Sequence, residues 1–410
     1  MSYTKKRWLI LTASCFINLC IGSLYAWSVL AGPMAEYLGG LKGVTLTAKD
    51  LAIVFTLANS VGPITMIAGG KINDTLGPKI VVLLGGMMFG GGMFLSGFAD
   101  SVGFLIVTYS LLLGLGLGMV YGATISTCIK FFPDKRGLVG GLTTSTFGIS
   151  SVIIPPIAAM IISATGPTTA FKVIGAAFIV IIGISSLFIE KCPADFVPEG
   201  FIPPAAVSGG KKTDSKDWKA MLATPEFYVM ITMLTCGAFA ALMFIPMISP
   251  IAQNMIGISP TAATAAVSTL ALFNVFGRVF AGSISDKIGR INTLAAACVF
   301  SVLGLVLLYM AKEGDIALFY VGISIIGICF GAFMGVFPGF TADQFGPRYN
   351  SVNYGIMFIG FALAGYAGPS ILNHIYGGSG SYNKAFLIAM VFSAAGLLLT
   401  FLYRMLKKRQ

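Results

Sequence analysis

Charged side chains are scarce in this chain of 410 residues. Asp, Glu, Lys and Arg together make up 10% of it, whereas an ordinary soluble domain carries about 25%. So few charges cannot cover a water-facing surface, and a soluble globular enzyme is therefore excluded. Glycine and proline, at 51 and 18 residues, also fall short of the share that marks collagen-like or low-complexity disordered chains.

Cysteine and histidine are few as well. None of the seven cysteines forms a CxxC pair, and the one histidine, His374, lies far from all of them in the sequence. We therefore expect small apolar packing residues rather than a disulfide framework or a metal site, no cofactor, and a solvated loop position for His374. The absence of a P-loop argues against an ATP-driven pump.

Long apolar runs are abundant: 56% of the residues are hydrophobic, and the mean hydropathy is +0.90. Short charged clusters separate these runs, and a membrane-spanning helix needs about 20 apolar residues. The sequence therefore predicts an all-α membrane protein, whose first span is too long for a signal peptide. The twelve predicted transmembrane spans are 8–33, 51–71, 80–98, 103–129, 137–164, 170–190, 226–250, 262–284, 291–311, 315–342, 350–374 and 382–403.

Lysine and arginine are distributed unevenly between the segments that join these spans. With the N-terminus placed in the cytoplasm, 20 of the 26 basic residues lie in cytoplasmic segments and five in outer segments, while Arg278 lies inside a span. The positive-inside rule then predicts cytoplasmic N- and C-termini in the plasma (inner) membrane. The net charge of +11 thus indicates topology, and we expect no nucleic-acid partner.

A polar stretch at 191–224, rich in Pro, Gly, Ser, Lys and Asp, separates the sixth span from the seventh. Its composition is typical of a flexible linker, here on the cytoplasmic side. It divides the chain into an N-terminal bundle of six helices at 1–190 and a C-terminal bundle of six helices at 225–410.

An internal repeat relates the two halves. The pattern G-x-x-x-D-x-x-G occurs at residues 70–77 and again at 282–289, an offset of 212 residues. Its glycines permit close helix approach and positive φ, and its aspartate can cap a helix or pair with a basic residue of a neighbouring loop. The same offset pairs two arginines. The residues expected to gate a conformational change are Gly70, Asp74, Gly77, Gly282, Asp286, Gly289, Arg136 and Arg348.

These features resemble the major facilitator superfamily. Residues 70–79 are similar to its signature between spans two and three, and residues 282–290 to the second copy between spans eight and nine. The resemblance covers essentially the whole chain. It implies two six-helix bundles related by a pseudo-two-fold repeat around a central cavity, which work by alternating access.

No acidic residue lies mid-membrane in the predicted spans, and Arg278 is the basic residue well inside one. A charge at that depth costs about 2.5–3.5 kcal/mol on insertion scales and needs a partner or water. We interpret Arg278 as facing a wet cavity, where its guanidinium binds a carboxylate substrate through two N–H groups. Snorkelling and bonds to backbone carbonyls are the alternatives.

Asn274 lies one helical turn before Arg278 on the same helix face. Its amide could hold a second substrate oxygen, orient the guanidinium, or bond a neighbouring helix. The 212-residue offset pairs Met66 with Arg278, which predicts a site with one charged half and one apolar half.

A closer resemblance is spread over the chain. Residues 25–28, 132–137, 285–290 and 353–355, together with Arg278, are similar to the oxalate/formate antiporter branch of the superfamily. The oxalate carrier of that branch holds its anion with an Arg of span eight and a Lys of span eleven, inside a box of aromatic side chains. For each aromatic residue taken singly, packing in the core or against lipid is the favoured interpretation, so the evidence for the box is collective. The further substrate-binding residues that the resemblance and the 212-residue offset imply are Tyr25, Tyr121, Phe147, Phe330, Phe333, Met334, Phe358 and Phe361.

This chain has Phe361 at the position where that carrier has its lysine, so it lacks the second cation that would bind the anion. Oxalate carries two negative charges and one arginine compensates one of them, so we predict a monocarboxylate such as lactate, pyruvate or formate. Animal monocarboxylate transporters, a second resemblance, place an Asp for proton coupling where this chain has Asn274. Because an amide does not titrate, a coupled proton would travel with the substrate or on another group.

The resulting prediction is a secondary active transporter of a small monocarboxylate, coupled to a proton or to carboxylate exchange, working as a monomer in the lipid bilayer. The first alternative is an oxalate/formate antiporter. The second is a non-transporting membrane receptor, for which the short tails leave no signalling domain. An intramembrane enzyme is disfavoured because no acids or nucleophile–base pairs lie at membrane depth.

Overall fold

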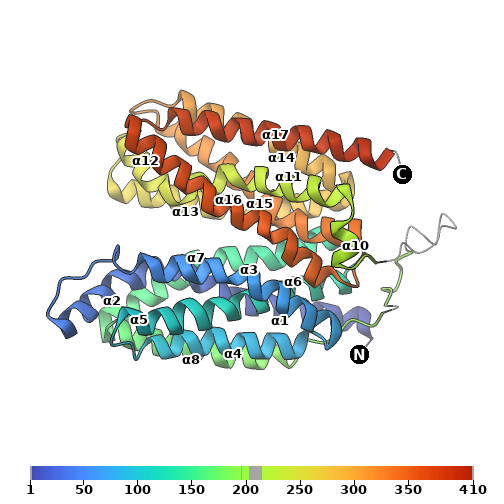
Figure 1. Ribbon diagram of the computed structural model, residues 1–410, viewed down its shortest axis with the longest axis horizontal. Coiled ribbons are helices and arrows are strands. Elements are labelled where there is room, and N and C mark those ends of the chain that lie inside the picture. The colour runs from blue at the N-terminus through green and yellow to red at the C-terminus, as the bar shows by residue number, and fades with distance from the viewer. Residues whose placement is uncertain (1, 195, 203–214, 409–410) are drawn as a thin grey trace. The chain divides into compact units, whose positions relative to one another are not determined.

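The computed structural model describes residues 2–194, 196–202 and 215–408, and the regular structure of these residues is helical throughout (Figure 1). Twelve helical segments are long and apolar enough to cross a membrane, which confirms the predicted number of spans. Helices suit apolar runs of this length because they satisfy every backbone N–H and C=O group within the segment.

The first six spans follow the predicted order, and most of their ends lie within a few residues of the expected positions. They are α1 with η1 and α2 (Tyr3–Ile21, Gly22–Ala26, Trp27–Lys42), α3 (Ala52–Thr75), α4 (Pro78–Ser96), α5 with η2 and α6 (Val102–Leu105, Ile106–Leu113, Gly114–Phe131), α7 (Arg136–Thr165) and α8 (Pro167–Ser186). The predicted end of span one at residue 33 is wrong. The helix continues through Pro33 to Lys42, and Gly43 ends it at a φ of +64°.

The second six spans also follow the predicted order. They are α11 with η3 and α12 (Pro225–Phe244, Ile245–Met247, Ile248–Asn254), α13 (Pro260–Ile288), α14 (Arg290–Met310), α15 (Ile316–Phe345), α16 (Asn350–Ser379) and α17 (Asn383–Lys408). His374 is exposed as expected, but the predicted loop position is wrong. The residue lies on α16, which continues beyond it to Ser379.

The described residues form two compact units, and each unit takes the beginning of one helix from the other half of the sequence. The first unit falls within Met1–Asp134, Thr146–Ser215 and Gly346–Gly355. The second falls within Lys135–Ser145, Lys216–Phe345 and Ile356–Gln410. The first turns of α7 therefore pack with the second unit, and the first turns of α16 pack with the first unit.

The predicted linker at 191–224 includes residues 203–214, which lie outside the described residues. Its last part contains a short helix, α10 (Trp218–Leu222). This helix begins after Asp217, whose carboxylate accepts a hydrogen bond from the Ala220 amide at 2.9 Å.

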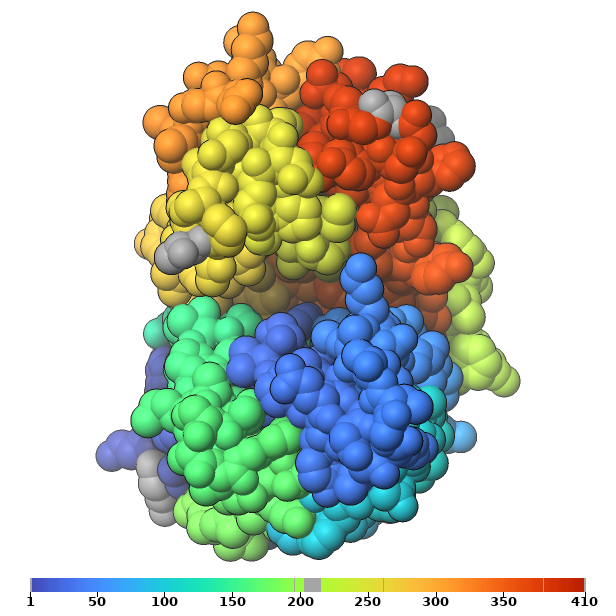
Figure 2. Space-filling view, turned by 90° about the vertical axis from the view of Figure 1, so that its left-hand side faces the viewer, coloured from blue at the N-terminus to red at the C-terminus, as the bar shows by residue number. Residues whose placement is uncertain are grey.

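Within the first unit, successive spans run in alternating directions. The connections at 43–51, 97–101 and residue 166 lie at one end of that unit, seen as blue, cyan and green surface in Figure 2. The motif at 70–77 lies at its other end, where α3 turns into α4 through Gly77, which has a φ of +108°. Only glycine adopts this φ readily, so the motif glycine serves the turn.

Glycine stripes set the closest helix contacts in both units. In the first unit Gly118 of α6 meets the carbonyl of Gly62 on α3, and in the second Gly331 of α15 meets the carbonyl of Asn274 on α13. Small residues allow backbones to approach in this way. Since Gly62 and Asn274 differ by 212 residues while Gly118 and Gly331 differ by 213, the offset between the halves is not constant.

Two local differences account for this drift. Helix α14 has 21 residues where its counterpart α4 has 19, and the π-helical η2 of the first unit takes up an extra residue within span four. The predicted pairing of Tyr121 with Phe333 is therefore wrong, because the glycine contacts align Tyr121 with Met334.

The pairing of Arg136 with Arg348 is also wrong. Gly282 meets the backbone of Gly137, while Gly70 meets the backbone of Ser351, so the offset between α7 and α16 has grown to 214 residues. Arg136, the first residue of α7, thus corresponds to Asn350, the first residue of α16.

Candidate substrate site

Three charged residues are buried as whole residues in the described part of the chain, namely Arg7, Glu226 and Arg278; the side chain of Asp74 is also buried and pairs with Lys130. Arg7 pairs with Asp134 at 2.6 Å, and Glu226 also has interaction partners. Arg278 differs from both, because no carboxylate of the described residues forms an ion pair with it. A buried cation without an anion is costly, so the site is suited to an anion from outside the protein.

Two hydrogen bonds fix the Arg278 side chain, and both partners belong to the second unit. Its Nε donates to Oδ1 of Asn274 at 3.1 Å, and its Nη1 donates to the backbone carbonyl of Thr144 at 2.6 Å. Its Nη2 has no hydrogen-bond partner in the described part of the chain, yet it is not sealed from solvent. The guanidinium is therefore held in one orientation while part of its donor set stays available to a ligand.

Glycines also fix the backbone that carries Arg278. A methyl group at Gly331 would overlap the Asn274 carbonyl, and one at Gly335 or at Gly141 would overlap the Arg278 carbonyl. Gly331 and Gly335 are one helical turn apart on α15, and Gly141 lies on the first turns of α7. Helix α13 is thus held closely by two neighbouring helices at the level of Arg278.

Substituting Gly331→Ala is expected to destabilise the protein by about 1–3 kcal/mol, because the added methyl group meets backbone atoms that cannot move aside. Thermal unfolding of the purified protein in detergent would show this as a lowered midpoint. Gly91→Ala on α4 is the matched control, since no atom lies within 4 Å of its added methyl group. Equal midpoints for the two variants would contradict the close packing described here.

The predicted aromatic residues form two separate groups, one in each unit. In the first unit the ring of Phe147 lies 6.0 Å from Tyr25 and 5.0 Å from Tyr121, measured between centroids. In the second unit the ring of Phe361 stacks 4.5 Å from Phe358 and 6.3 Å from Phe330. In each group one ring is buried, Tyr121 in the first and Phe330 in the second, while the other rings are partly exposed.

Phe333 and Met334 are buried more completely than the members of these two groups. Phe333 is 1% exposed and its ring fills the space beside Gly237 of α11. Met334 is 2% exposed. The structure therefore places both in the packed core of the second unit, and the expectation that they contact substrate stays a prediction. Phe333 entered the prediction partly through the constant repeat offset, which does not hold in α15.

The motif aspartates each bind the beginning of a helix. In the first unit Asp74 pairs with Lys130 at 2.7 Å and accepts a hydrogen bond from the Val352 amide at 3.2 Å. In the second unit Asp286 accepts hydrogen bonds from the amides of Gly137 and Leu138, both at 2.9 Å. Negative charge at a helix N-terminus is favourable, because the first amides of a helix lack intrahelical acceptors.

An ion-pair cluster adds to this arrangement in the second unit. Arg290 pairs with Asp286 at 2.6 Å and with Asp343 at 2.8 Å, while Arg136 pairs with Asp343 at 2.6 Å. Arg348 is exposed and lies 5.3 Å from the ring of Tyr349. The structure thus brings Arg136 into the cluster and leaves Arg348 out of it.

Sequence reasoning missed Lys130, Arg290, Asp343 and the carbonyl of Thr144. A signal existed for Arg290, which directly follows the second motif in the sequence. For the Thr144 carbonyl no sequence signal exists, since every residue carries a backbone carbonyl.

Comparison with known proteins agrees with this architecture. A model of the Major Facilitator Superfamily matches residues 9–369 and 238–410. The chain belongs to the major facilitator superfamily. Its members are membrane transporters rather than enzymes, so this protein is a transporter.

Several relatives cover nearly the whole transporter. It is 32% identical to an oxalate:formate antiporter of Oxalobacter formigenes, over 95% of this chain and 89% of that protein. It is 23% identical to monocarboxylate transporter 12-B of Danio rerio, over 83% of this chain and 77% of that protein. Among solved structures, the superfamily transporter FucP in the outward conformation matches with a TM-score of 0.72 at 14% identity, covering 96% of this chain and 98% of that one.

Proposed function

We propose that the transporter moves a small monocarboxylate anion, of the lactate, pyruvate or formate type, and that Arg278 binds the carboxylate. The observation that carries this proposal is the buried guanidinium of Arg278, which has no carboxylate partner in the described part of the chain. A substrate carboxylate would supply the missing charge and accept two N–H groups at once. The names of the relatives, an oxalate:formate antiporter and a monocarboxylate transporter, support a carboxylate.

A single negative charge fits this site better than two. Arg278 compensates one charge, and the neighbouring surface of Phe330, Phe358 and Phe361 is apolar. A second carboxylate placed against those rings would lose its hydration without gaining a partner. The apolar surface suits the methyl group of lactate or pyruvate instead.

Oxalate/formate exchange is the second candidate function. It is favoured by the 32% identity to the oxalate:formate antiporter over 95% of this chain. Oxalate/formate exchange is disfavoured because this chain has Phe361 where the oxalate carrier has its lysine. The receptor hypothesis is weakened by membership of a transporter superfamily.

The proposal also covers how transport is coupled, which contacts gate it and how the protein lies in the membrane. Asn274 does not titrate, so a proton moves with the substrate or on another group, or the carrier exchanges one carboxylate for another. The Asp74 and Asp286 contacts at helix starts act as conformational gates. The transporter works as a monomer in the plasma membrane with both termini in the cytoplasm, as the lysine and arginine distribution favours.

Uptake by the purified transporter in proteoliposomes tests the proposal. We expect labelled lactate, pyruvate or formate to enter, driven by a pH gradient or by a carboxylate inside, well above the rate in protein-free vesicles. Labelled oxalate is expected to exchange at least tenfold more slowly, because its second charge lacks a partner; one unpaired charge costs more than the 1.4 kcal/mol that a factor of about ten represents. Exchange of oxalate as fast as formate would favour the second candidate, and transport of none of these acids would contradict both.

A further inference from the structure

The middle of α13 carries an asparagine that helix packing does not require. Asn274 lies near the centre of Pro260–Ile288, where an amide is unfavourable both as a helix former and as a polar group at membrane depth. Its counterpart in the first unit is Gly62, and the same close backbone contact with a glycine of a neighbouring helix occurs at both positions. The side chain of Asn274 is therefore explained by what it binds and not by how α13 packs.

Asn274 occurs together with Arg278, and the other half of the chain has neither. The counterpart of Arg278 is Met66, four residues after Gly62. Oδ1 of Asn274 accepts the hydrogen bond from Nε of Arg278 at 3.1 Å, and no other side chain of the described residues forms a hydrogen bond with this guanidinium. The two residues thus form a pair that one unit has and the other lacks.

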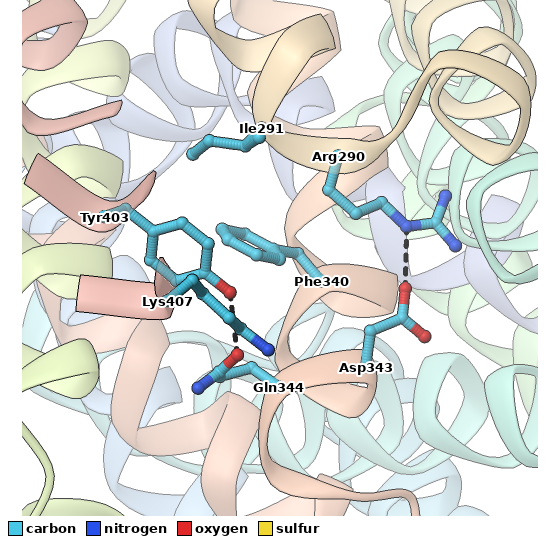
Figure 3. Close-up of a pocket in the computed structure, with 7 residues that line it drawn as sticks. All are labelled: Arg290, Ile291, Phe340, Asp343, Gln344, Tyr403 and Lys407. Carbon is cyan, nitrogen blue, oxygen red and sulfur yellow. Dashed lines mark hydrogen bonds and ion pairs between the residues drawn. The ribbon is translucent and has the colours of Figure 1, made fainter. Parts of the chain in front are cut away.

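A second arginine of the same unit shows such a pair with an acidic partner. Arg290 also has a polar residue four positions before it, Asp286, and the two form an ion pair at 2.6 Å. Its Nε donates to Oδ2 of Asp343 at 2.8 Å, the contact dashed in Figure 3. Arg290 therefore binds carboxylates with Nε and Nη1, whereas Arg278 binds an amide oxygen and a peptide oxygen with the same two atoms. The protein compensates the charge of Arg290 and leaves that of Arg278 uncompensated.

The hydrogen bonds also decide which donors of Arg278 stay open. A carboxylate accepts two parallel N–H groups either from Nε with one Nη atom or from the two Nη atoms. Because Asn274 occupies Nε, the first arrangement is closed. One N–H of Nη1 donates to the Thr144 carbonyl, so three N–H groups remain, and all of them lie on the two Nη atoms. A substrate carboxylate therefore meets the guanidinium at its Nη end.

We propose that Asn274 is a positioning residue for the substrate and not one of its ligands. By accepting from Nε, its carbonyl oxygen directs the Nη end of Arg278 toward the carboxylate. Because an amide carries no charge, it does so without compensating the guanidinium. An aspartate would hold the same pose but would neutralise the charge that the substrate needs. This inference rests on the proposed function, in which Arg278 binds the carboxylate of a monocarboxylate.

Asn274→Asp tests the charge argument, because it keeps the shape and the acceptor oxygen and adds one negative charge. The KM for uptake of labelled lactate or pyruvate into proteoliposomes is expected to rise by about tenfold or more, since the substrate must displace an ion pair. Asn383→Asp makes the same exchange at an exposed position at the start of α17 and should leave KM unchanged. A folded Asn274→Asp transporter with an unchanged KM would overturn the inference.

A double-substitution cycle separates positioning from direct contact with the substrate. Asn274→Ala frees Nε and is expected to raise KM by about three- to tenfold when Arg278 is present. Lysine lacks the Nε donor, so in the Arg278→Lys background the same substitution should change KM by less than about twofold. Equal losses in the two backgrounds would show that Asn274 contacts the substrate itself and would overturn the positioning role.

A measurement without substrate separates this inference from the proposed function. Asn274→Asp gives the buried guanidinium of Arg278 an anionic partner, so the thermal unfolding midpoint of the purified transporter in detergent should rise. A raised midpoint with no transport of any monocarboxylate would contradict the proposed function alone. A midpoint that does not rise, in a transporter that takes up monocarboxylates, would show that Arg278 is not an uncompensated charge and would overturn the inference.

Discussion

Substituting Arg278→Gln is expected to lower monocarboxylate uptake by about 30-fold or more. Removing one partner of a buried hydrogen-bonded charge pair costs about 2–5 kcal/mol, and each 1.4 kcal/mol is about a factor of ten. Glutamine keeps hydrogen-bonding capacity but supplies no positive charge for the carboxylate. Initial rates of labelled lactate or pyruvate uptake in proteoliposomes, at substrate concentrations below saturation, would measure the loss.

The same substitution is not expected to impair folding. Without substrate the Arg278 guanidinium is buried and has no carboxylate partner in the described part of the chain. Replacing it with a neutral side chain removes the desolvation cost of an uncompensated buried charge. The unfolding midpoint of Arg278→Gln should therefore equal or exceed that of the unchanged protein. A lowered midpoint would instead indicate that the bonds to Asn274 and Thr144 are chiefly structural.

Two further variants separate charge from geometry. Arg278→Lys keeps the positive charge but loses the planar pair of N–H donors, so uptake should be intermediate. Lys384→Gln removes an exposed positive charge from the start of α17 and should leave uptake unchanged. Full uptake by Arg278→Gln would show that the carboxylate binds elsewhere.

The number and order of the spans could be predicted because membrane spans depend mainly on apolar length. Their ends were harder to predict. Pro33 and Glu36 were expected to lie at or beyond the end of span one, yet the helix includes both. A proline within a membrane helix is tolerated when neighbouring groups satisfy the freed backbone carbonyl.

The sequence is informative about the proposed site where a residue type is rare and not where it is common. Arg278 is a candidate because no other charge lies mid-span in the sequence, whereas an individual phenylalanine among 32 carries little information. Phe333 and Met334 illustrate this limit, since both are buried in the core. The growth of the repeat offset from 212 to 214 was likewise hidden, because the two additional residues of α14 relative to α4 leave no clear mark in the sequence.

The corrected alignment of the repeat pairs Phe361 with an aromatic residue of the first unit. With an offset of 214 in α7 and α16, Phe361 corresponds to Phe147 of the first unit. Each ring is the shared member of its aromatic group: Phe361 stacks on Phe330 and Phe358, and Phe147 meets Tyr25 edge to face and Tyr121 at a tilt. Phe330, one partner of Phe361, directly precedes Gly331, which meets the Asn274 carbonyl. This chain of contacts connects Phe361 to the helix that carries Arg278.

Substituting Phe361→Lys is therefore expected to shift substrate preference toward oxalate. A second cation would pair with the second carboxylate, and a hydrogen bond to a charged group contributes about 1.5–3 kcal/mol. The ratio of oxalate to monocarboxylate uptake should rise by about tenfold or more. Competition between labelled formate and unlabelled oxalate in the same proteoliposomes would measure this ratio directly.

Phe361→Met is the matched control, because it removes the ring and adds no charge. If the lysine acts through its charge, Phe361→Met should leave the ratio close to that of the unchanged transporter, and the double variant Arg278→Gln with Phe361→Lys should lose oxalate uptake again. The double variant should lose oxalate uptake because each of the two carboxylates of oxalate needs its own cation. A folded Phe361→Lys variant with an unchanged ratio would exclude Phe361 from the site. The substrate contact would then have to be sought on the other aromatic group, that of Tyr25, Tyr121 and Phe147.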